Sequence, residues 1–197
     1  MKIILVRHGQ TNENAAHRHQ PDHTPLSILG RQQAMAVGDK LADRRLTHVV
    51  SSPLVRALQT ASLIASKSDL IPSIDHDLHE LARHRSMTGH GHYSLRSLLF
   101  YKFWFLGLTR SGESYRALRL RAARVRAHLE LLPDDAVVAV VSHTVFLNLF
   151  VVHLTRTRSL WPWQAAAVFL RLIKMPNTGT IELTCNDGVW RRVKSNQ

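Results

Sequence analysis

Residues 136–141 read AVVAVV, an uninterrupted apolar run that is typical of a parallel β-strand covered on both faces. Residues 2–6 and 47–51 are two further short apolar runs that predict strands. Segments with helical spacing of apolar residues separate these strands, beginning with residues 26–41. This alternation predicts an α/β protein, a three-layer α/β/α sandwich around a mainly parallel central sheet.

The other segments extend this prediction. Two closing strands are expected at 180–184 and 189–193, because the Asn-Asp-Gly sequence at 186–188 is a strong hairpin-turn signal. The chain contains no linker, repeat or low-complexity tract, so we expect a single domain spanning residues 1–197. Further helices are expected at 53–64, 94–108, 112–132 and 144–154, a strand at 73–78, and another apolar segment at 164–173.

The charge of the chain is strongly positive. It has 26 Lys and Arg against 14 Asp and Glu, a formal net charge of +12. Residues 83–128 hold ten of these cations and one acidic residue, Glu113. Such a field attracts anions and speeds encounter with phosphorylated ligands, although a solvated helix face has the same composition. Charge alone leaves phosphate esters, nucleic acid and an acidic membrane surface open as partners.

The composition also bears on location. A single cysteine, Cys185, excludes an internal disulfide framework. The apolar residues 3–6 are too few for the core of a signal peptide, and no stretch reaches the ~18–20 uncharged apolar residues of a membrane span. We therefore expect a cytoplasmic protein.

Polar residues directly follow three of the predicted strands, at 7–9, 51–53 and 142–144. In open sheets of this kind, ligands bind beyond the carboxyl ends of the strands. Arg7 offers a planar fork of donors for two phosphate oxygens, and the neighbouring His8 is a competent nucleophile when it is neutral. These residues predict a site for phosphoryl chemistry.

Two more residues extend this pocket. Arg56 lies in the first turns of the helix after the second strand, and His143 follows the strand at 136–141, so both are candidate donors to the same phosphate. The pocket has no cysteine and too few acids to hold a metal. The histidine pairs at 17–19 and 90–92 also lack matched partners at ligand spacing, so we expect no metal.

Six segments, in order along the chain, resemble the histidine phosphatase superfamily, which has the phosphoglycerate mutase-like fold. They are LVRHGQTNEN at 5–14, DHTPLSILGRQQA at 22–34, VVSSPLVRALQTASLI at 49–64, LHE at 78–80, GES at 112–114 and VVAVVSH at 137–143. Arg-His-Gly alone is a weak signal, but Ser-Ser-Pro-x-x-Arg and a late Ser-His at these separations make the resemblance specific. It covers most of the chain.

The resemblance implies a metal-independent phosphomonoesterase that needs no cofactor and acts on a small anionic phosphorylated substrate. His8 would attack the phosphoryl group and form phosphohistidine, which water would then hydrolyse. Arg7, Arg56 and His143 would bind the phosphate oxygens and stabilise charge in the transition state. Glu80 stands in the place of the acid that protonates the leaving group.

Other positions carry weaker expectations. The sequence that follows Glu80 departs from the family pattern, so Asp77, Glu113 and His84 stay open as the acid. Thr144 stands where relatives commonly have glycine, and its side chain would narrow the pocket. The residues that match substrate-binding positions of relatives are Gln10, Thr11, Asn14 and Thr144.

Residues 93–108 (YSLRSLLFYKFWFLGL) fall where this family has its variable lid, and we expect a helical lid insertion around residues 81–110. Arg96 and Lys102 among these large apolar groups leave three roles open. They are an apolar wall of the pocket, a peripheral contact with an anionic membrane through residues 93–126, and a homodimer face. Two other functions also stay open, a non-catalytic phosphate-binding or regulatory relative and a phosphoglycerate mutase-type phosphotransferase, whereas no nucleic-acid partner is expected.

Overall fold

A six-stranded sheet lies at the centre of the computed structural model, which describes residues 1–108, 112–156 and 175–193. The strands are β1 (Lys2–Arg7), β2 (His48–Ser51), β3 (Ser73–Ile74), β4 (Val137–Ser142), β5 (Thr180–Asn186) and β6 (Val189–Arg192). Their order is β3-β2-β4-β1-β5-β6, and the first three pairs of neighbours are parallel, whereas β5 is antiparallel to β1 and β6. The predicted mainly parallel sheet is confirmed.

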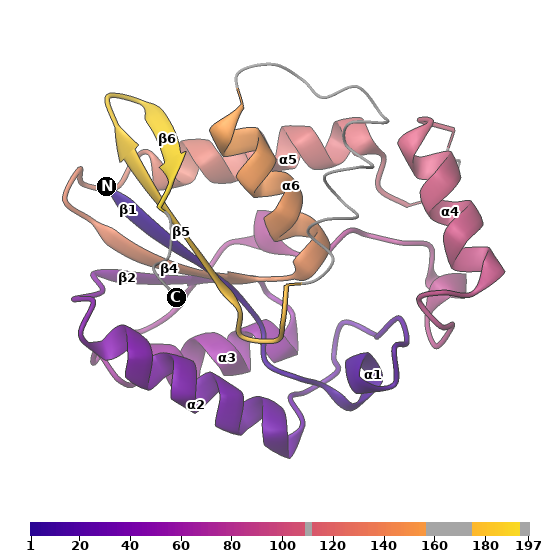
Figure 1. The fold of residues 1–197 in the computed structure, drawn as a ribbon, viewed down its shortest axis with the longest axis horizontal. Helices are drawn as coiled ribbons and strands as arrows, with labels where there is room; N and C mark the ends of the chain where they lie inside the picture. The colour runs from indigo at the N-terminus through magenta and orange to yellow at the C-terminus, as the bar shows by residue number, and fades with distance from the viewer. Residues whose placement is uncertain (109–111, 157–174, 194–197) are drawn as a thin grey trace.

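Helices cover both faces of this sheet. The helices of the described residues are α1 (Asn12–Ala15), α2 (Ile28–Ala42), α3 (Val55–Ala65), α4 (Leu95–Phe105), α5 (Tyr115–Leu129) and α6 (Thr144–Thr155), with 3₁₀ helices η1 (His76–Leu78) and η2 (Arg85–Met87). Figure 1 shows α2 and α3 on one face and α5 and α6 on the other. The predicted three-layer α/β/α architecture is therefore confirmed.

The central strands contribute to two separate hydrophobic cores. In β1, Ile3 and Leu5 pack in the core that includes α5 and α6, whereas Ile4 and Val6 pack in the core that includes α2 and α3. All four side chains are fully buried. The run is apolar at every position because successive side chains of a strand point to opposite faces and both faces are covered.

The strand predicted at 73–78 is shorter in the structure. β3 covers only Ser73–Ile74, because the Asp75 carboxylate then accepts a hydrogen bond from the Asp77 amide at 2.8 Å and caps η1. This tight turn ends the pairing with β2 and leads the chain toward Glu80. Residues 75–78, predicted as strand, are therefore the turn and 3₁₀ helix that precede the candidate acid.

The closing hairpin between β5 and β6 agrees with its turn signal. Asp187 and Gly188 have φ values of 51° and 72°. Two consecutive positive φ angles are what a type I′ turn requires, and Asn-Asp-Gly supplies residues that tolerate them. The apolar segment predicted at 164–173 lies outside the described residues.

The helix α4 lies at the edge of the molecule, in the region of the predicted lid (Figure 1). Trp104 is fully buried, and its indole Nε1 donates to the Glu113 carbonyl oxygen at 2.7 Å. Leu95, Leu99 and Phe103 are exposed, so the apolar run packs into the body only in part. Contact of residues 93–126 with a membrane or a second subunit stays a prediction. In the described part of the chain, no helix combines the length and the apolar character needed to cross a membrane.

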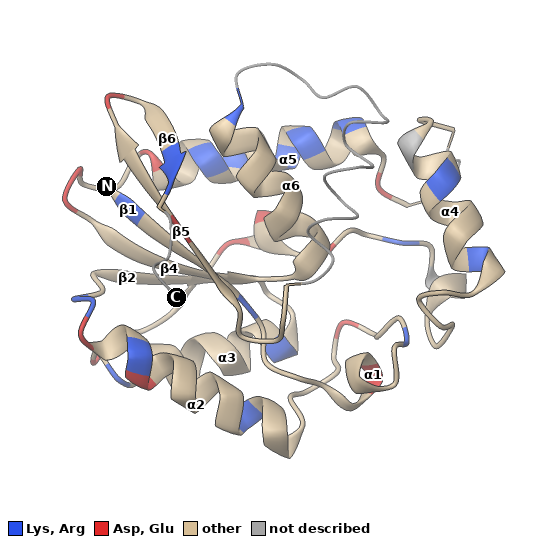
Figure 2. Cartoon of the chain, viewed as in Figure 1, with Lys and Arg blue, Asp and Glu red and all other residues tan. Residues whose placement is uncertain are grey.

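The arginines of the basic segment at 83–128 differ in their exposure to solvent. Figure 2 shows the arginines spaced along α5. Arg116, Arg119 and Arg124 are exposed, which is the arrangement of a solvated helix face. Arg121 is buried and pairs with Glu113 at 2.7 Å. Most of the positive charge on α5 thus faces water rather than a ligand cavity.

Candidate active site

The carboxyl ends of β1, β2 and β4 meet at one edge of the sheet. Arg7 pairs in register with Ser142, and Ser51 pairs with Val141. The amide of His8 donates to the Ser142 carbonyl oxygen at 3.0 Å, which extends the ladder by one step. The predicted convergence of these three strand ends is present in the structure.

His8 is buried and held by its own neighbour. Its Nδ1 lies 2.7 Å from the Gly9 carbonyl oxygen, which only accepts hydrogen bonds, so Nδ1 carries the proton and Nε2 has the free lone pair. Burial, followed by the charges of Arg56 and Arg7, lowers the pKa of His8 well below its ordinary value. The ring is therefore neutral at pH 7 with a nucleophilic Nε2.

Gly9 is required by the close approach of α2. A Cβ atom at this position would lie 2.4 Å from the Gly30 carbonyl oxygen, a backbone atom that cannot move aside cheaply. The Gly9 amide donates to Thr60 Oγ1 of α3 at 3.1 Å. These contacts fix the turn that presents His8.

His143 lies beside His8. The two ring centroids are 5.1 Å apart with an interplanar angle of 58°. Nε2 of His143 lies 2.8 Å from Ser52 Oγ, whereas Nδ1 is buried and has no hydrogen-bond partner among the described residues. His143 is the N-cap residue of α6, but its side chain makes no capping bond, so helix capping does not account for it. Burial, followed by the charge of Arg56, lowers its pKa well below the ordinary value.

Two arginines flank the histidines. Arg7 donates to the Met175 carbonyl oxygen, and Arg56, which is buried, donates to the Pro21 carbonyl oxygen at 3.0 Å. Neither has an ion-pair partner within the described ranges. Burial lowers the pKa of Arg56 to about 10, so both guanidinium groups stay charged at neutral pH. Two cations without carboxylate partners make this pocket a receptor for an anion.

Glu80 reaches the same cavity from the loop after η1. Oε1 accepts from the amides of Leu81 at 2.9 Å and Phe146 at 3.1 Å, and Oε2 accepts from the Val145 amide at 3.4 Å. Val145 and Phe146 are in the first turn of α6, so Glu80 supplies the capping bonds that His143 does not. This fixes the carboxylate close to the strand ends.

The other candidate acids are placed differently. Glu113 is not part of the cavity lining and binds Arg121 through both carboxylate oxygens, at 2.8 and 2.7 Å. Asp77 borders the cavity, but both of its oxygens accept from Arg124 at 2.7 Å, and these bonds lower its pKa. His84 also borders the cavity and bonds Ser86 Oγ at 2.7 Å. Among these candidates, Glu80 has the carboxylate that faces the arginines without a cationic hydrogen-bond partner.

The four predicted substrate-binding residues divide into two pairs. Asn14 and Thr144 line the cavity, whereas Gln10 and Thr11 do not. The Gln10 side chain and carbonyl accept from Ser27 Oγ at the start of α2, both at 3.2 Å. The Thr11 hydroxyl caps α1 and donates to Gln20 at 2.7 Å. The polar groups of Gln10 and Thr11 hold the loop after β1, and their contact with a substrate stays a prediction.

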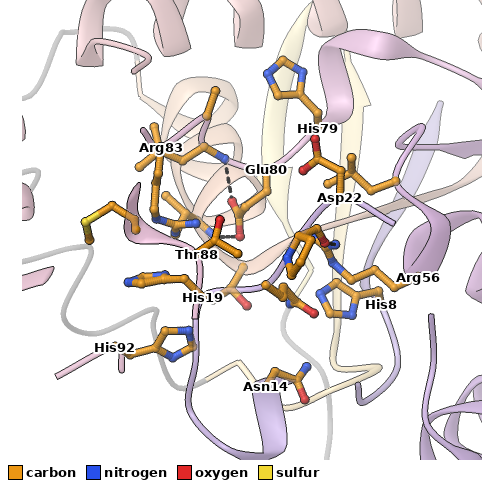
Figure 3. A pocket seen from close by; sticks show the side chains of 18 of the residues that line it. His8, Asn14, His19, Asp22, Arg56, His79, Glu80, Arg83, Thr88 and His92 are labelled. Carbon is orange, nitrogen blue, oxygen red and sulfur yellow. Dashed lines mark hydrogen bonds between the residues drawn. The ribbon is translucent and has the colours of Figure 1, made fainter. Parts of the chain in front are cut away.

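The cavity also contains residues that the sequence analysis did not assign. It has a volume of about 1310 Å³, and Figure 3 shows Asp22, His19, His92 and Arg83 in it, together with His8, Arg56 and Glu80. These side chains come from loops, which carry no periodic pattern. The sequence gives a hint of a place in the site only for two of them: Asp22 begins the 22–34 segment, and Arg83 follows Glu80 by three residues. In residues 1–108, 112–156 and 175–193, no group of three or more His, Cys, Asp or Glu side chains is arranged to hold a metal ion.

Fold and site together define an α/β/α protein with an anion pocket of two arginines and two histidines at the ends of parallel strands. The chain belongs to the histidine phosphatase superfamily (branch 1), whose family model matches residues 3–197.

Curated and solved relatives agree with this membership. The chain is 40% identical over 82 residues to a "Probable phosphoglycerate mutase GpmB" of Salmonella choleraesuis (strain SC-B67), a match that spans 41% of this chain and 38% of that protein. The solved "Mycobacterial hydrolase 1" is 25% identical with a TM-score of 0.82, covering 100% of this chain and 98% of the other. A mycobacterial glucosyl-3-phosphoglycerate phosphatase in complex with VO3 is 26% identical with a TM-score of 0.80, covering 99% and 98%. Phosphatases and mutases are thus both present among the similar proteins.

Proposed function

We propose that this protein is a metal-independent phosphomonoesterase that forms a phosphohistidine on His8. The observation that carries the proposal is a neutral, buried imidazole with a free Nε2 between two arginines that have no ion-pair partner in the described chain. A dianionic phosphate ester would supply the missing negative charge and place its phosphorus in front of that nitrogen.

In the first step, the Nε2 lone pair of His8 forms the N–P bond as the bond from phosphorus to the ester oxygen breaks. Arg7, Arg56 and His143 hold the remaining phosphate oxygens and stabilise their charge in the transition state. The leaving oxygen takes a proton from Glu80, whose carboxyl group is fixed by the amides of α6.

In the second step, water attacks phosphorus and gives a proton to Glu80, and the N–P electron pair returns to His8 as inorganic phosphate leaves. The Gly9 carbonyl oxygen keeps the proton on Nδ1 of His8 throughout, so Nε2 is regenerated as the nucleophile. Because the arginines supply the positive charge, we expect activity to be insensitive to chelators.

The test is hydrolysis of 4-nitrophenyl phosphate by the purified protein with excess chelator. His8→Ala should abolish turnover, and Arg7→Ala or Arg56→Ala should lower it by about 10²–10³-fold, because each removes a charged donor to the transition state. His48→Ala is the matched control, since His48 begins β2 at the opposite end of the strand from the site. Retained turnover in His8→Ala, or loss of turnover on chelation, would contradict the proposal.

A phosphotransferase of the phosphoglycerate mutase type is the second candidate, favoured by the 40% identity to the probable mutase. It is separated by incubation with 3-phosphoglycerate: a phosphatase releases inorganic phosphate, whereas a mutase forms the isomeric 2-phosphoglycerate without net release. A non-catalytic relative would bind inorganic phosphate but turn over neither 3-phosphoglycerate nor 4-nitrophenyl phosphate.

A further inference from the structure

The cavity extends past the proposed phosphate pocket into the lid. Its volume of about 1310 Å³ exceeds the space that one phosphate group fills. In Figure 3, Arg83 and His8 lie on opposite sides of Glu80. The residues that form this outer end, here called the lid subsite, are His19, Arg83, Met87, His92, Leu98 and Tyr101.

Arg83 is the cation of the lid subsite, and it is fixed in place. Its Nε and Nη2 donate to the Tyr101 hydroxyl at 3.1 and 2.8 Å, and its Cζ lies 5.7 Å from the centre of the Tyr101 ring. A guanidinium has five N–H donors, so this contact leaves most of the fork available. Tyr101 thereby orients the guanidinium of Arg83.

Arg83 differs from three arginines of α5 in having no carboxylate partner. Arg121 pairs with Glu113, Arg124 with Asp77 and Arg126 with Glu130. No such ion pair to Arg83 is present in the part of the chain that the structure describes.

The surroundings of Arg83 do not cancel its charge. Glu80 acts electrostatically on Arg83, Arg7 and Arg56, and Asp22 acts on Arg56, so two carboxylates face three arginines. His19 is neutral, because burial and then the charge of Arg83 lower its pKa to about 3, and burial also lowers the pKa of His92. The lid subsite therefore has one cation beside neutral and apolar walls.

We propose that the lid subsite binds a second anionic group, a carboxylate or a phosphate, on the alcohol portion of the substrate. This inference rests on the proposed function only in placing the reacting phosphate between Arg7, Arg56 and His8. Arg83 offers a planar donor fork that matches either anion, while Met87 and Leu98 contact the apolar part that joins the two groups. A neutral alcohol would leave Arg83 without an anion.

The test compares three aryl phosphates that share the reacting group: phenyl phosphate, 4-carboxyphenyl phosphate and 1,4-phenylene bisphosphate. The measured quantity is the ratio of kcat/KM for each charged substrate to that for phenyl phosphate, so effects on the shared chemistry cancel. We expect a preference of about 10- to 100-fold for a charged substrate, the range for a hydrogen bond to a charged group. The arm with the larger ratio identifies the second anion as a carboxylate or a phosphate.

Three variants assign that preference to the lid subsite. Arg83→Gln should reduce the ratio to near one by raising KM for the charged substrate, Arg83→Lys should retain part of it, and Tyr101→Phe should weaken it by freeing the guanidinium. Arg96→Gln is the matched control, because Arg96 is an exposed arginine of α4 that bonds Ser86 and His90 and does not line the cavity. A ratio near one in the parent protein, or an unchanged ratio in Arg83→Gln, would overturn the inference.

A binding measurement separates this inference from the proposed function. Calorimetry of His8→Ala with the same three compounds reports affinity without turnover. Tighter binding of a charged compound, lost in His8→Ala/Arg83→Gln, would support the lid subsite even if the parent protein hydrolysed none of them, and in that case only the proposed function would fail. Equal affinities, or no binding, would overturn the lid subsite itself.

Discussion

At His8, one hydrogen bond decides which nitrogen can react. Because the Gly9 carbonyl oxygen takes the Nδ1 proton, the lone pair is restricted to Nε2. The neighbouring arginines then act twice, since they lower the pKa of His8 and so keep it neutral, and they attract the anion that it attacks. Burial is the largest cause of the lowered pKa of His8, and the two arginines add to it while they also supply the charge that binds phosphate.

Glu80 can be tested through the basicity of the leaving group. Glu80→Gln keeps the shape of the side chain but cannot transfer a proton, and its single amide oxygen can replace only one of the two carboxylate oxygens that accept from α6. We expect it to slow hydrolysis of an alkyl phosphate such as glycerol 3-phosphate by about 10²-fold or more, because general acid catalysis contributes about 10²–10⁴-fold. The comparison uses kcat/KM, which reports the first step, and for 4-nitrophenyl phosphate this value should change far less, since nitrophenolate leaves without a proton. Equal slowing of both substrates would remove Glu80 from the acid role.

The residues that could be predicted from the sequence are those that follow buried strands. Arg7 and His8 line the cavity and His143 lies beside His8, because an apolar run fixes where a strand ends and parallel strands end together. The bond from the Ser27 hydroxyl to the Gln10 side chain could not be predicted, because nothing local in the sequence indicated it. Arg83 was counted among the basic residues, but its orientation depends on Tyr101, which comes from a different element.

At the scale of elements, α5 is joined to the active-site loop by a buried arginine. Arg121 binds Glu113 through two hydrogen bonds, and its Nη1 also donates to the carbonyl oxygens of Asp77 and His79 at 2.6 Å. Both charged side chains of the pair are nearly inaccessible, with 3% and 9% exposed. The Arg121 contacts therefore position the segment that immediately precedes Glu80.

Two arginines of α5 provide a matched comparison of stability. Arg121→Ala should lower the free energy of unfolding by about 3–5 kcal/mol, because it leaves the Glu113 carboxylate buried and unpaired. Arg124→Ala should cost far less, because the Arg124 side chain is exposed and water screens its pair with Asp77. Urea denaturation measures both values. Similar losses for the two variants would contradict this account of the buried pair.

The elements differ in how well the sequence predicted them. The helices and strands of the body agree with their apolar spacing, as in α2 and β4. β3 is shorter than predicted because an Asp75 cap, rather than a change in hydrophobicity, ends it. The exposure of Leu99 and Phe103 on α4 could not be predicted either, since large apolar residues in a run usually indicate packing and the sequence does not specify which face is covered.

For the whole molecule, buried neutral histidines couple stability to pH. The folded-state pKa values of His8, His143 and His19 are all lowered, chiefly by burial, and that of His19 is lowered to about 3. In the unfolded chain these groups bind protons below about pH 6.5. The unfolded state then holds more protons than the folded state, so stability must decrease as pH falls below that value.

Thermal unfolding between pH 7.5 and 5.5 tests this coupling, in a range where carboxylates contribute little. We expect Tm to decrease toward pH 5.5. His19→Gln cannot take up a proton in the unfolded state, so its Tm should decline less steeply than that of the parent protein. Exposed His23→Gln is the control and should keep the parent slope. A flat Tm in the parent protein, or an unchanged slope in His19→Gln, would contradict the burial of neutral histidines.

The most direct measurement is to locate the phosphate on the enzyme during turnover. Protein mixed with excess 4-nitrophenyl phosphate is quenched in alkali within the first turnovers, digested, and analysed by mass spectrometry with fragmentation that preserves the N–P bond. The account predicts phosphate on His8, none in His8→Ala, and none after the substrate is exhausted. Phosphate on any other side chain, or turnover of the parent protein without a phosphorylated form, would contradict it.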